Sequence, residues 1–172
     1  MNLFSPLLSR FKPLLIACFF FLVLAFHAPK SLAIIPPEFS GDSDILITQD
    51  MHGNDLKGYV FVKDDLRGVD LSEADLRGVV FNQTQLQGTD LRKTDMEDVV
   101  AFASLFDGAD LRDANLTSAL LMQSSFIEAQ IEGADFSNAV LDLIQQRALC
   151  TKAEGINSVT GVSTAESLGC GY

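Results

Sequence analysis

Residues 74–93 read ADLRG VVFNQ TQLQG TDLRK, and the five-residue phase of this stretch decides the fold. The third residue of each group of five is large and apolar, and the first is small or β-branched. Neither the 3.6-residue period of a helix nor the two-residue period of a strand keeps one face apolar through such a pattern. The phase holds for twenty consecutive groups, whose third positions are Leu46, Met51, Leu56, Phe61, Leu66, Leu71, Leu76, Phe81, Leu86, Leu91, Met96, Ala101, Phe106, Leu111, Leu116, Leu121, Phe126, Ile131, Phe136 and Leu141.

Two further positions of the repeat have a preferred chemistry. Asp often stands directly before the large residue, where it favours turns by hydrogen bonding to nearby backbone. Examples are Asp65, Asp70, Asp75, Asp90, Asp95, Asp110 and Asp135. Gly often stands two residues after the large one, at Gly58, Gly68, Gly78, Gly88, Gly108 and Gly133. Each group of five therefore resembles a short side that ends in a corner.

The segments EADLRGVVFN, GTDLRKTDME and GADLRDANLT resemble the A-(D/N)-L-x-x unit of the pentapeptide-repeat family, roughly over residues 45–142. The resemblance implies an all-β fold, a right-handed quadrilateral β-helix in which four pentads form one coil. Residues 20 apart then stack at about 4.8 Å, and nearly five coils bury continuous columns of side chains. Ala101 is small for its column, so we expect either a local void or an inward shift of Phe102.

The flanks of the repeat predict the other parts of the chain. We expect a signal peptide at residues 1–33, an N-terminal extension or cap at 34–45, the β-helix at 46–142 and a short helical cap at 143–172. The leader carries basic residues, then the unbroken apolar run 14–26, then Ser31-Leu32-Ala33 as a cleavage site. Thirteen residues rise only about 20 Å as a helix, too little to span a bilayer. A lipoprotein box ending at Cys18 is the alternative, although an apolar run follows it.

The charge of the chain excludes one large class of partners. There are 23 Asp and Glu residues against 12 Lys and Arg, a net charge of −11, and the pI is near 4.4. Binding of nucleic acid through its phosphates needs a basic surface, so we expect none. The mean hydropathy is nevertheless +0.23, because residues 1–37 are apolar and contain no acid. Apart from the uncleaved signal during export, we expect no contact with the membrane.

The cysteines and the tail point to an exported protein. Cys18 leaves with the signal, so Cys150 and Cys170 remain, and an even count in an exported chain favours one disulfide over two free thiols. With no CxxC pair and His52 as the one mature histidine, we expect no metal and no cofactor. The tail segments AEGINSVTG and SLGC resemble the ends of pentapeptide-repeat proteins of the thylakoid lumen of cyanobacteria and plastids. This resemblance implies the thylakoid lumen or the periplasm.

The sequence predicts no enzyme, since no nucleophile, base and orienting group can be assigned among the mature residues. One alternative is an enzyme that uses the carboxylate-rich faces. Asp70, Asp90 and Asp110 should stack, however, with Arg92 and Arg112 as counter-charges. Another alternative is an acidic mimic of DNA that inhibits a nucleic-acid enzyme, as cytoplasmic relatives do, but an export signal argues against it.

One side of the predicted β-helix is apolar on its outside. We call it the apolar stripe, and it consists of Val60, Val62, Val80, Val100, Phe102, Leu120, Met122 and Val140. Large exposed apolar patches mark interaction surfaces in soluble proteins. The stripe is covered by the chain itself, through Ile34–Phe39 or the helix after Leu141, or by a protein partner or second copy, or it is simply exposed. The function we expect is a non-catalytic interaction or scaffold module.

Overall fold

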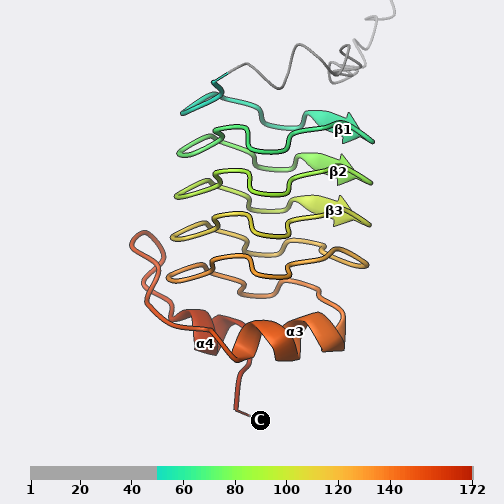
Figure 1. The fold of residues 1–172 in the computed structure, drawn as a ribbon. Helices are drawn as coiled ribbons and strands as arrows, with labels where there is room; N and C mark the ends of the chain where they lie inside the picture. The colour runs from blue at the N-terminus through green and yellow to red at the C-terminus, as the bar shows by residue number, and fades with distance from the viewer. Residues whose placement is uncertain (1–49, 172) are drawn as a thin grey trace, which may run out of the picture. The chain divides into compact units, whose positions relative to one another are not determined.

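The computed structural model describes residues 50–171. Three short strands, β1 (Val60–Val62), β2 (Val80–Asn82) and β3 (Val100–Phe102), form a parallel sheet in that order (Figure 1). Val60 pairs with Val80, and Val80 pairs with Val100, so partners are 20 residues apart. The predicted stacking register is therefore confirmed.

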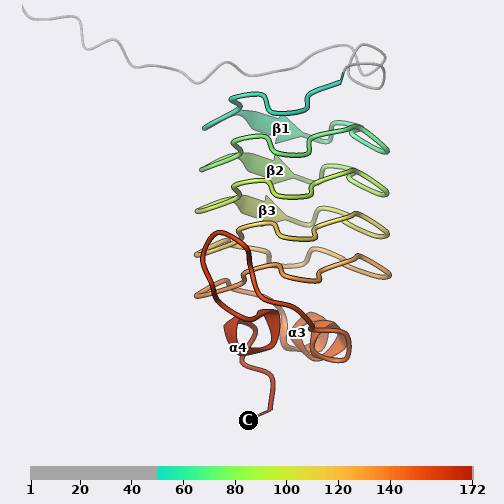
Figure 2. The same ribbon diagram turned by 90° about the vertical axis from the view of Figure 1, so that its left-hand side faces the viewer.

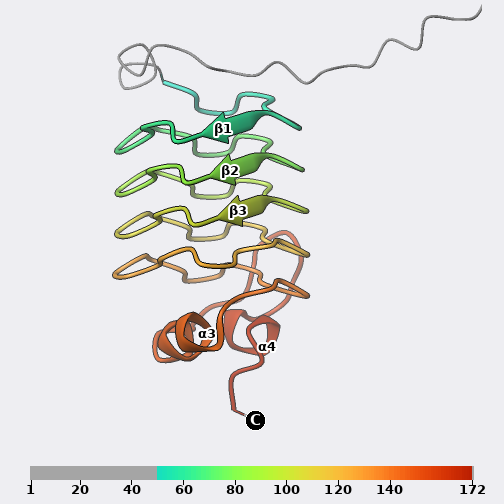
Figure 3. The same ribbon diagram turned by 90° about the vertical axis from the view of Figure 1, so that its right-hand side faces the viewer.

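The other sides of the coil follow the same register. Isolated parallel bridges join Asp70 to Asp90, Asp75 to Asp95 and Gln85 to Leu105, each again 20 residues apart. Because the repeat has five residues, one coil has four sides. Figures 2 and 3 show from two directions how the coils lie flat on one another along a common axis.

Every corner of the β-helix uses left-handed backbone. From Gly53 to Asn138, the residue two after each inward position has a φ between 52° and 71°. Glycine adopts this conformation without steric cost, which explains why it recurs there. Eleven of these corners nevertheless carry other residues, among them Lys63 and Asp98. The stacked coils therefore hold the corner conformation even where the side chain opposes it.

The interior consists of the predicted large and small columns. The large side chains from Phe61 to Phe136 are almost completely buried. In one small column the hydroxyl groups donate hydrogen bonds to carbonyl oxygens of the coil before, from Thr84 to Phe61 at 3.2 Å and from Ser104 to Phe81 at 3.0 Å. These bonds satisfy polar groups that would otherwise be costly to bury.

The expected inward shift of Phe102 is wrong. Ala101 is fully buried, but Phe102 is 38% exposed and stays on the outside of its coil. The missing volume comes from the next column, where Phe106 stands in the place that Leu66 and Leu86 take in the preceding coils. The Phe106 ring meets Phe81, the residue before Ala101 in its column, edge to face.

Two helices follow the repeat, α3 (Leu143–Cys150) and α4 (Thr164–Ser167). Helix α3 lies across the C-terminal end of the coils (Figure 1), where Leu149 and Leu168 are buried in the core cluster. The sulfur atoms of Cys150 and Cys170 are 2.02 Å apart. Neither of the described helices is long and apolar enough to cross a bilayer. The predicted signal peptide (1–33) and extension (34–45) lie outside the described residues.

Candidate interaction surface

The structure places the apolar stripe in two parallel columns on the side that carries β1, β2 and β3. The first column is a ladder of backbone partners at 20-residue spacing, Val60, Val80, Val100, Leu120 and Val140. The second column, on the other side of the inward residues, contains Val62, Asn82, Phe102 and Met122. All eight predicted residues thus lie on one side, and the polar Asn82 stands in the second column between Val62 and Phe102.

The exposure of the stripe varies between its columns and along its height. Val60, Val80 and Val100 are half-buried by their neighbours. Val62 is 51% exposed, Met122 43% and Val140 44%. An antiparallel or open sheet commonly packs one face and presents polar residues to water on the other. Here both faces are apolar, so the outer face has the chemistry of a surface that is buried against another layer.

The described part of the tail does not lie on this side. Helix α3 crosses the end of the coils, and its residues Leu143 and Ile144 are 58% and 81% exposed. The expectation that the helix after Leu141 covers the stripe is therefore wrong. The other segment considered for this role, Ile34–Phe39, lies outside the described residues.

Two of the other sides carry paired charges. The Arg77 guanidinium donates two hydrogen bonds to Asp75, at 2.7 and 2.9 Å, and Arg92 binds Asp90 at 2.5 and 2.9 Å in the same way. These bonds hold the pKa of both carboxyl groups below their ordinary value. Arg92 also lies 3.7 Å from Asp110 of the next coil. The expected ladder of Asp70, Asp90 and Asp110, with Arg92 and Arg112 as counter-charges, is confirmed.

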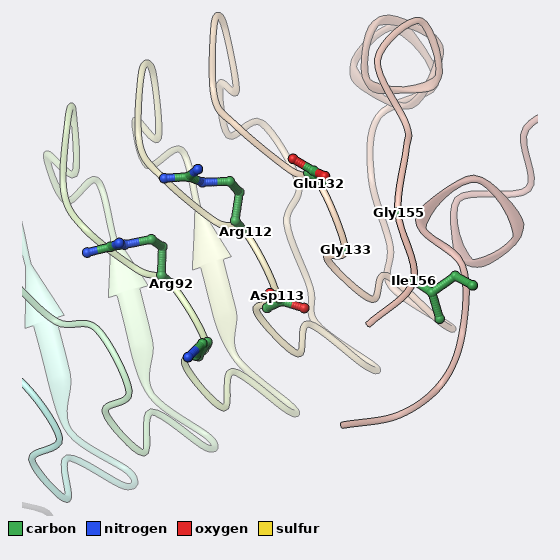
Figure 4. Close-up of a pocket in the computed structure, with 8 residues that line it drawn as sticks. Arg92, Arg112, Asp113, Glu132, Gly133, Gly155 and Ile156 are labelled. Carbon is green, nitrogen blue, oxygen red and sulfur yellow. The ribbon is translucent and has the colours of Figure 1, made fainter. Parts of the chain in front are cut away.

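A hollow of about 390 Å³ lies between this charged side and the tail (Figure 4). Arg92 and Arg112 line it from successive coils, with Glu132 in the same column, and Gly155 and Ile156 line it from the tail. Because Arg112 also donates to Asp110, at 2.5 and 2.8 Å, both guanidinium groups are already occupied by carboxylates. The hollow is therefore a structural junction between repeat and tail.

Asn157 fastens the tail to the side of the β-helix. It is 1% exposed, and its amide donates to the carbonyl oxygens of Gly133 at 2.9 Å and of Asp113 and Ala114 at 3.2 Å. The Asn157 side-chain oxygen, Oδ1, accepts the N–H groups of Val159 and Thr160. Sequence reasoning singled out this tail segment only as a resemblance and missed the contact, which spans up to 44 residues.

The tail approaches the last coil through glycine. A β-carbon added at Gly155 would lie 2.7 Å from the backbone nitrogen of Gly133. The tail and the last coil therefore touch at two glycines, where neither segment has a side chain. The Gly133 N–H donates to the Glu154 carbonyl at 2.9 Å, and the Phe136 N–H donates to the Ser167 hydroxyl at 3.0 Å. The tail thereby supplies acceptors to the last coil, which has no further coil to bind.

Two acids of the β-helix are buried. Burial raises the pKa of Asp64, which accepts a hydrogen bond from the Val62 N–H at 2.9 Å. Burial also raises the pKa of Asp135, but hydrogen bonds from Ser137 and Thr160 outweigh this effect and leave the pKa below its ordinary value. Both carboxylates are isolated rather than paired, so they do not form the acid and base of a hydrolytic site.

The structure brings no group of metal ligands together. Within residues 50–171, no three His, Cys, Asp or Glu side chains are placed to hold an ion. His52 lies 2.9 Å from the Ser72 hydroxyl and 4.0 Å from Glu73 at the exposed first coil. The His52 ring therefore takes part in a local hydrogen bond with the Ser72 hydroxyl.

Comparison with known proteins agrees with this architecture. The family model for pentapeptide repeats matches eight copies, over residues 65–99 and 104–142. The thylakoid lumenal protein TL20.3 of Arabidopsis thaliana is 61% identical over 33 residues, or 19% of this chain. The matched part spans only 12% of the length of that protein.

Two crystal structures are similar in fold. A pentapeptide-repeat protein from the Arabidopsis thaliana thylakoid lumen is 28% identical, with a TM-score of 0.54, over 79% of this chain and 98% of that chain. A pentapeptide-repeat protein from the cyanobacterium Cyanothece 51142 is 24% identical, with a TM-score of 0.53, over 54% and 64%. The repeat region therefore matches the pentapeptide-repeat family over residues 65–99 and 104–142, and its fold is that of a right-handed β-helix similar to a member from the thylakoid lumen.

Proposed function

We propose that the mature chain is a non-catalytic protein-interaction or scaffold module that binds through the apolar stripe. The observation that carries the proposal is the ladder of outward apolar residues from Val60 to Val140, on the side formed by β1, β2 and β3. Folding requires apolar residues only at the inward positions, since outward positions face water in an isolated β-helix. A stripe on the outside therefore has a role in binding.

The proposal includes export to the thylakoid lumen or the periplasm. Its support is the basic, apolar and small-residue order of residues 1–33, together with the similarity to proteins of the thylakoid lumen. It also includes a β-helix of nearly five coils with a disulfide-closed helical cap. The support for that cap is the 2.02 Å distance between the sulfur atoms of Cys150 and Cys170.

The absence of catalysis is part of the same proposal. Asp75 and Asp90 are ion-paired with arginine and also accept backbone N–H groups at their turns. A general acid at neutral pH needs a raised pKa, and these pairs have the opposite effect.

Chemical crosslinking in native thylakoid or periplasmic fractions, followed by affinity purification, tests the role of the stripe. The double variant Val80→Lys/Val100→Lys puts two charges on it. Gln85→Lys/Gln130→Lys is the matched control, because it places the same charges at the same pentad position on other sides. We expect the stripe variant to lose its crosslinked partner and the control to keep it.

Circular dichroism and thermal unfolding show whether both variants keep the β-helix. If the stripe variant melts at a lower temperature but retains its partners, the stripe serves folding and the proposal is wrong. The same conclusion follows if both stability and crosslinking are unchanged.

A further inference from the structure

We propose that the stripe binds a second copy of this chain, packed face to face and antiparallel, around a two-fold axis that passes close to Phe102. This inference rests on the proposed role of the stripe as a binding surface. It goes further by naming the occupant and its orientation.

The sheet geometry favours another sheet as the occupant. β1, β2 and β3 cover the core with their inner face, and their outer face presents Val80, Val100 and Phe102. A sheet that is apolar on both faces is the middle layer of a larger stack, and flat sheet faces pack about 10 Å apart. A second copy presents a face of the same height, width and chemistry.

The order of residues along the stripe fits a two-fold axis perpendicular to the β-helix axis. Such an axis sets each column against itself in reverse order, so Val60 of one copy meets Val140 of the other. Phe102 belongs to the third of the five stacked levels, and it meets Phe102 of the second copy at the centre. Aromatic side chains near the centre of an interface contribute most to its affinity.

The charges at the two ends of the stripe are opposite. Lys63 is the exposed corner residue beside Val62 at the first level, and the exposed Asp142 follows the last level. No ion pair of either side chain occurs among residues 50–171, and the Asp142 carboxylate accepts the Gln123 N–H at 2.7 Å. In the antiparallel arrangement, Lys63 of each copy lies beside Asp142 of the other, which gives two ion pairs.

Asp98 distinguishes the antiparallel pair from a parallel pair. It is the exposed corner residue on the opposite rim, at the middle level beside Val100. In the antiparallel pair, Asp98 faces Asp98 of the second copy across the rim. In a parallel pair it would face Ala103, and Lys63 would face Gly58. The effect of Asp98 on association therefore reports the orientation of the copies.

The contact area is small, since one side of the β-helix over five levels is only about 20 Å tall. Interfaces of this size are weak and transient, so association should be visible only at high concentration. Sedimentation velocity of the mature chain from about 5 to about 500 μM covers the range in which such dimers form. We expect the sedimentation coefficient to rise with concentration toward that of a dimer.

Four variants test the arrangement. Phe102→Lys should abolish dimerisation, whereas Phe102→Leu should keep part of it. Lys63→Glu should weaken it about threefold or more, and adding Asp142→Lys should restore it, since the two ion pairs return with their charges exchanged. Asp98→Asn should strengthen dimerisation, because two like charges no longer face each other. Thermal unfolding confirms that each variant is folded before its association is compared.

The outcomes separate this inference from the proposed function. A chain that stays monomeric at every concentration, yet still loses its crosslinked partner in Val80→Lys/Val100→Lys, binds a different protein through the stripe. That result overturns the second copy and leaves the proposed function intact. A dimer that Asp98→Asn does not strengthen, and that the charge exchange does not restore, has another orientation and overturns the antiparallel arrangement. A dimer that Phe102→Lys leaves unchanged forms through another surface and overturns the second copy on the stripe, whereas the crosslinking of Val80→Lys/Val100→Lys decides the proposed function separately.

Discussion

Phe81 meets Phe106 edge to face, with ring centroids 6.4 Å apart and an interplanar angle of 88°. On either side of this contact the rings are stacked, Phe61 on Phe81 at 5.2 Å and Phe106 on Phe126 at 4.9 Å. The row of aromatic rings thus moves from one interior column to the next at the level of Ala101. The edge-to-face contact between Phe81 and Phe106 is where the row of rings passes from one column to the other.

Exchanging the side-chain sizes at positions 101 and 106 should leave the free energy of unfolding nearly unchanged, although each substitution alone should lower it. Ala101→Phe inserts a ring where Phe106 already fills the space, and overpacking costs about 1–3 kcal/mol. Phe106→Leu leaves a gap beside Ala101 and costs about 1–2 kcal/mol. We expect the double variant to unfold within about 1 kcal/mol of the original chain. Denaturant unfolding of the four proteins measures this coupling, and simple additivity would contradict it.

Cys150 and Cys170 should be joined in the exported protein. Mass spectrometry with alkylation, before and after reduction, should show the loss of one disulfide and the gain of two hydrogens. The loop between them spans 20 residues of sequence separation, for which the chain-entropy model gives about 3 kcal/mol. Cys150→Ser/Cys170→Ser should therefore lower the free energy of unfolding by about that amount. Two alkylated thiols in the untreated sample would show that the prediction is wrong.

Replacing Asn157 should release the tail. Asn157→Ala removes the donors to three backbone carbonyl oxygens and the acceptor for Val159 and Thr160, all in a buried place. Buried polar groups without partners cost about 1–3 kcal/mol each, so we expect a loss of several kcal/mol. Hydrogen exchange should accelerate at the Gly133 N–H, which donates to the tail, and stay slow at Leu91, inside the repeat. Equal acceleration at both sites would mean that Asn157 stabilises the whole β-helix rather than its cap.

The buried Asp135 should make the fold more stable above its ordinary pKa than below it. Its pKa is lowered in the folded chain from the ordinary value of 3.8. The ionised form is therefore favoured by folding, and this stability disappears as the pH falls below 3.8 through the folded pKa. Asp135→Asn should be less stable than the original chain at pH 7, and the difference should shrink in acid. Urea unfolding between pH 3 and 7 measures the difference.

Asp64 should show the opposite dependence. Burial raises its folded pKa above 3.8, so the folded chain binds a proton more tightly than the unfolded chain does. Stability from this group is complete below 3.8 and is lost as the pH rises through the folded pKa. Asp64→Asn should consequently be more stable than the original chain at pH 7, with a gain that declines in acid. A gain that grows in acid would contradict the burial of an ionised Asp64.

The repeat could be predicted from the sequence because its information is local and periodic. A phase of five identifies the inward positions, and the register of 20 follows from four sides, so even the columns of Phe61 and Leu66 could be assigned. The recurring Gly at Gly58 and Gly68 indicated the corners, and the left-handed backbone there accounts for it. The pattern also located the apolar stripe, since outward positions alternate with inward ones.

Other features depend on contacts that no period describes. Asn157 reaches carbonyl oxygens in two coils from a tail without a repeat, so neither spacing nor composition indicates its partners. The inward shift of Phe102, one of the two alternatives expected at Ala101, is wrong, and the sequence could not exclude it because the missing volume could be supplied from its own side or from the adjacent column. Only the packing of Phe106 decides between them. Likewise, the direction of α3 follows from the burial of Leu149, which the helical pattern alone does not indicate.

The corners constrain how the length of this chain can change during evolution. Each corner repeats after five residues, and each column repeats after 20, so an insertion of one residue would turn every later inward side chain toward water. Removal of a complete level, such as residues 81–100, would instead leave the columns above and below in register. Gain or loss of whole levels of 20 residues is therefore the change in length that preserves both the inward phase and the columns.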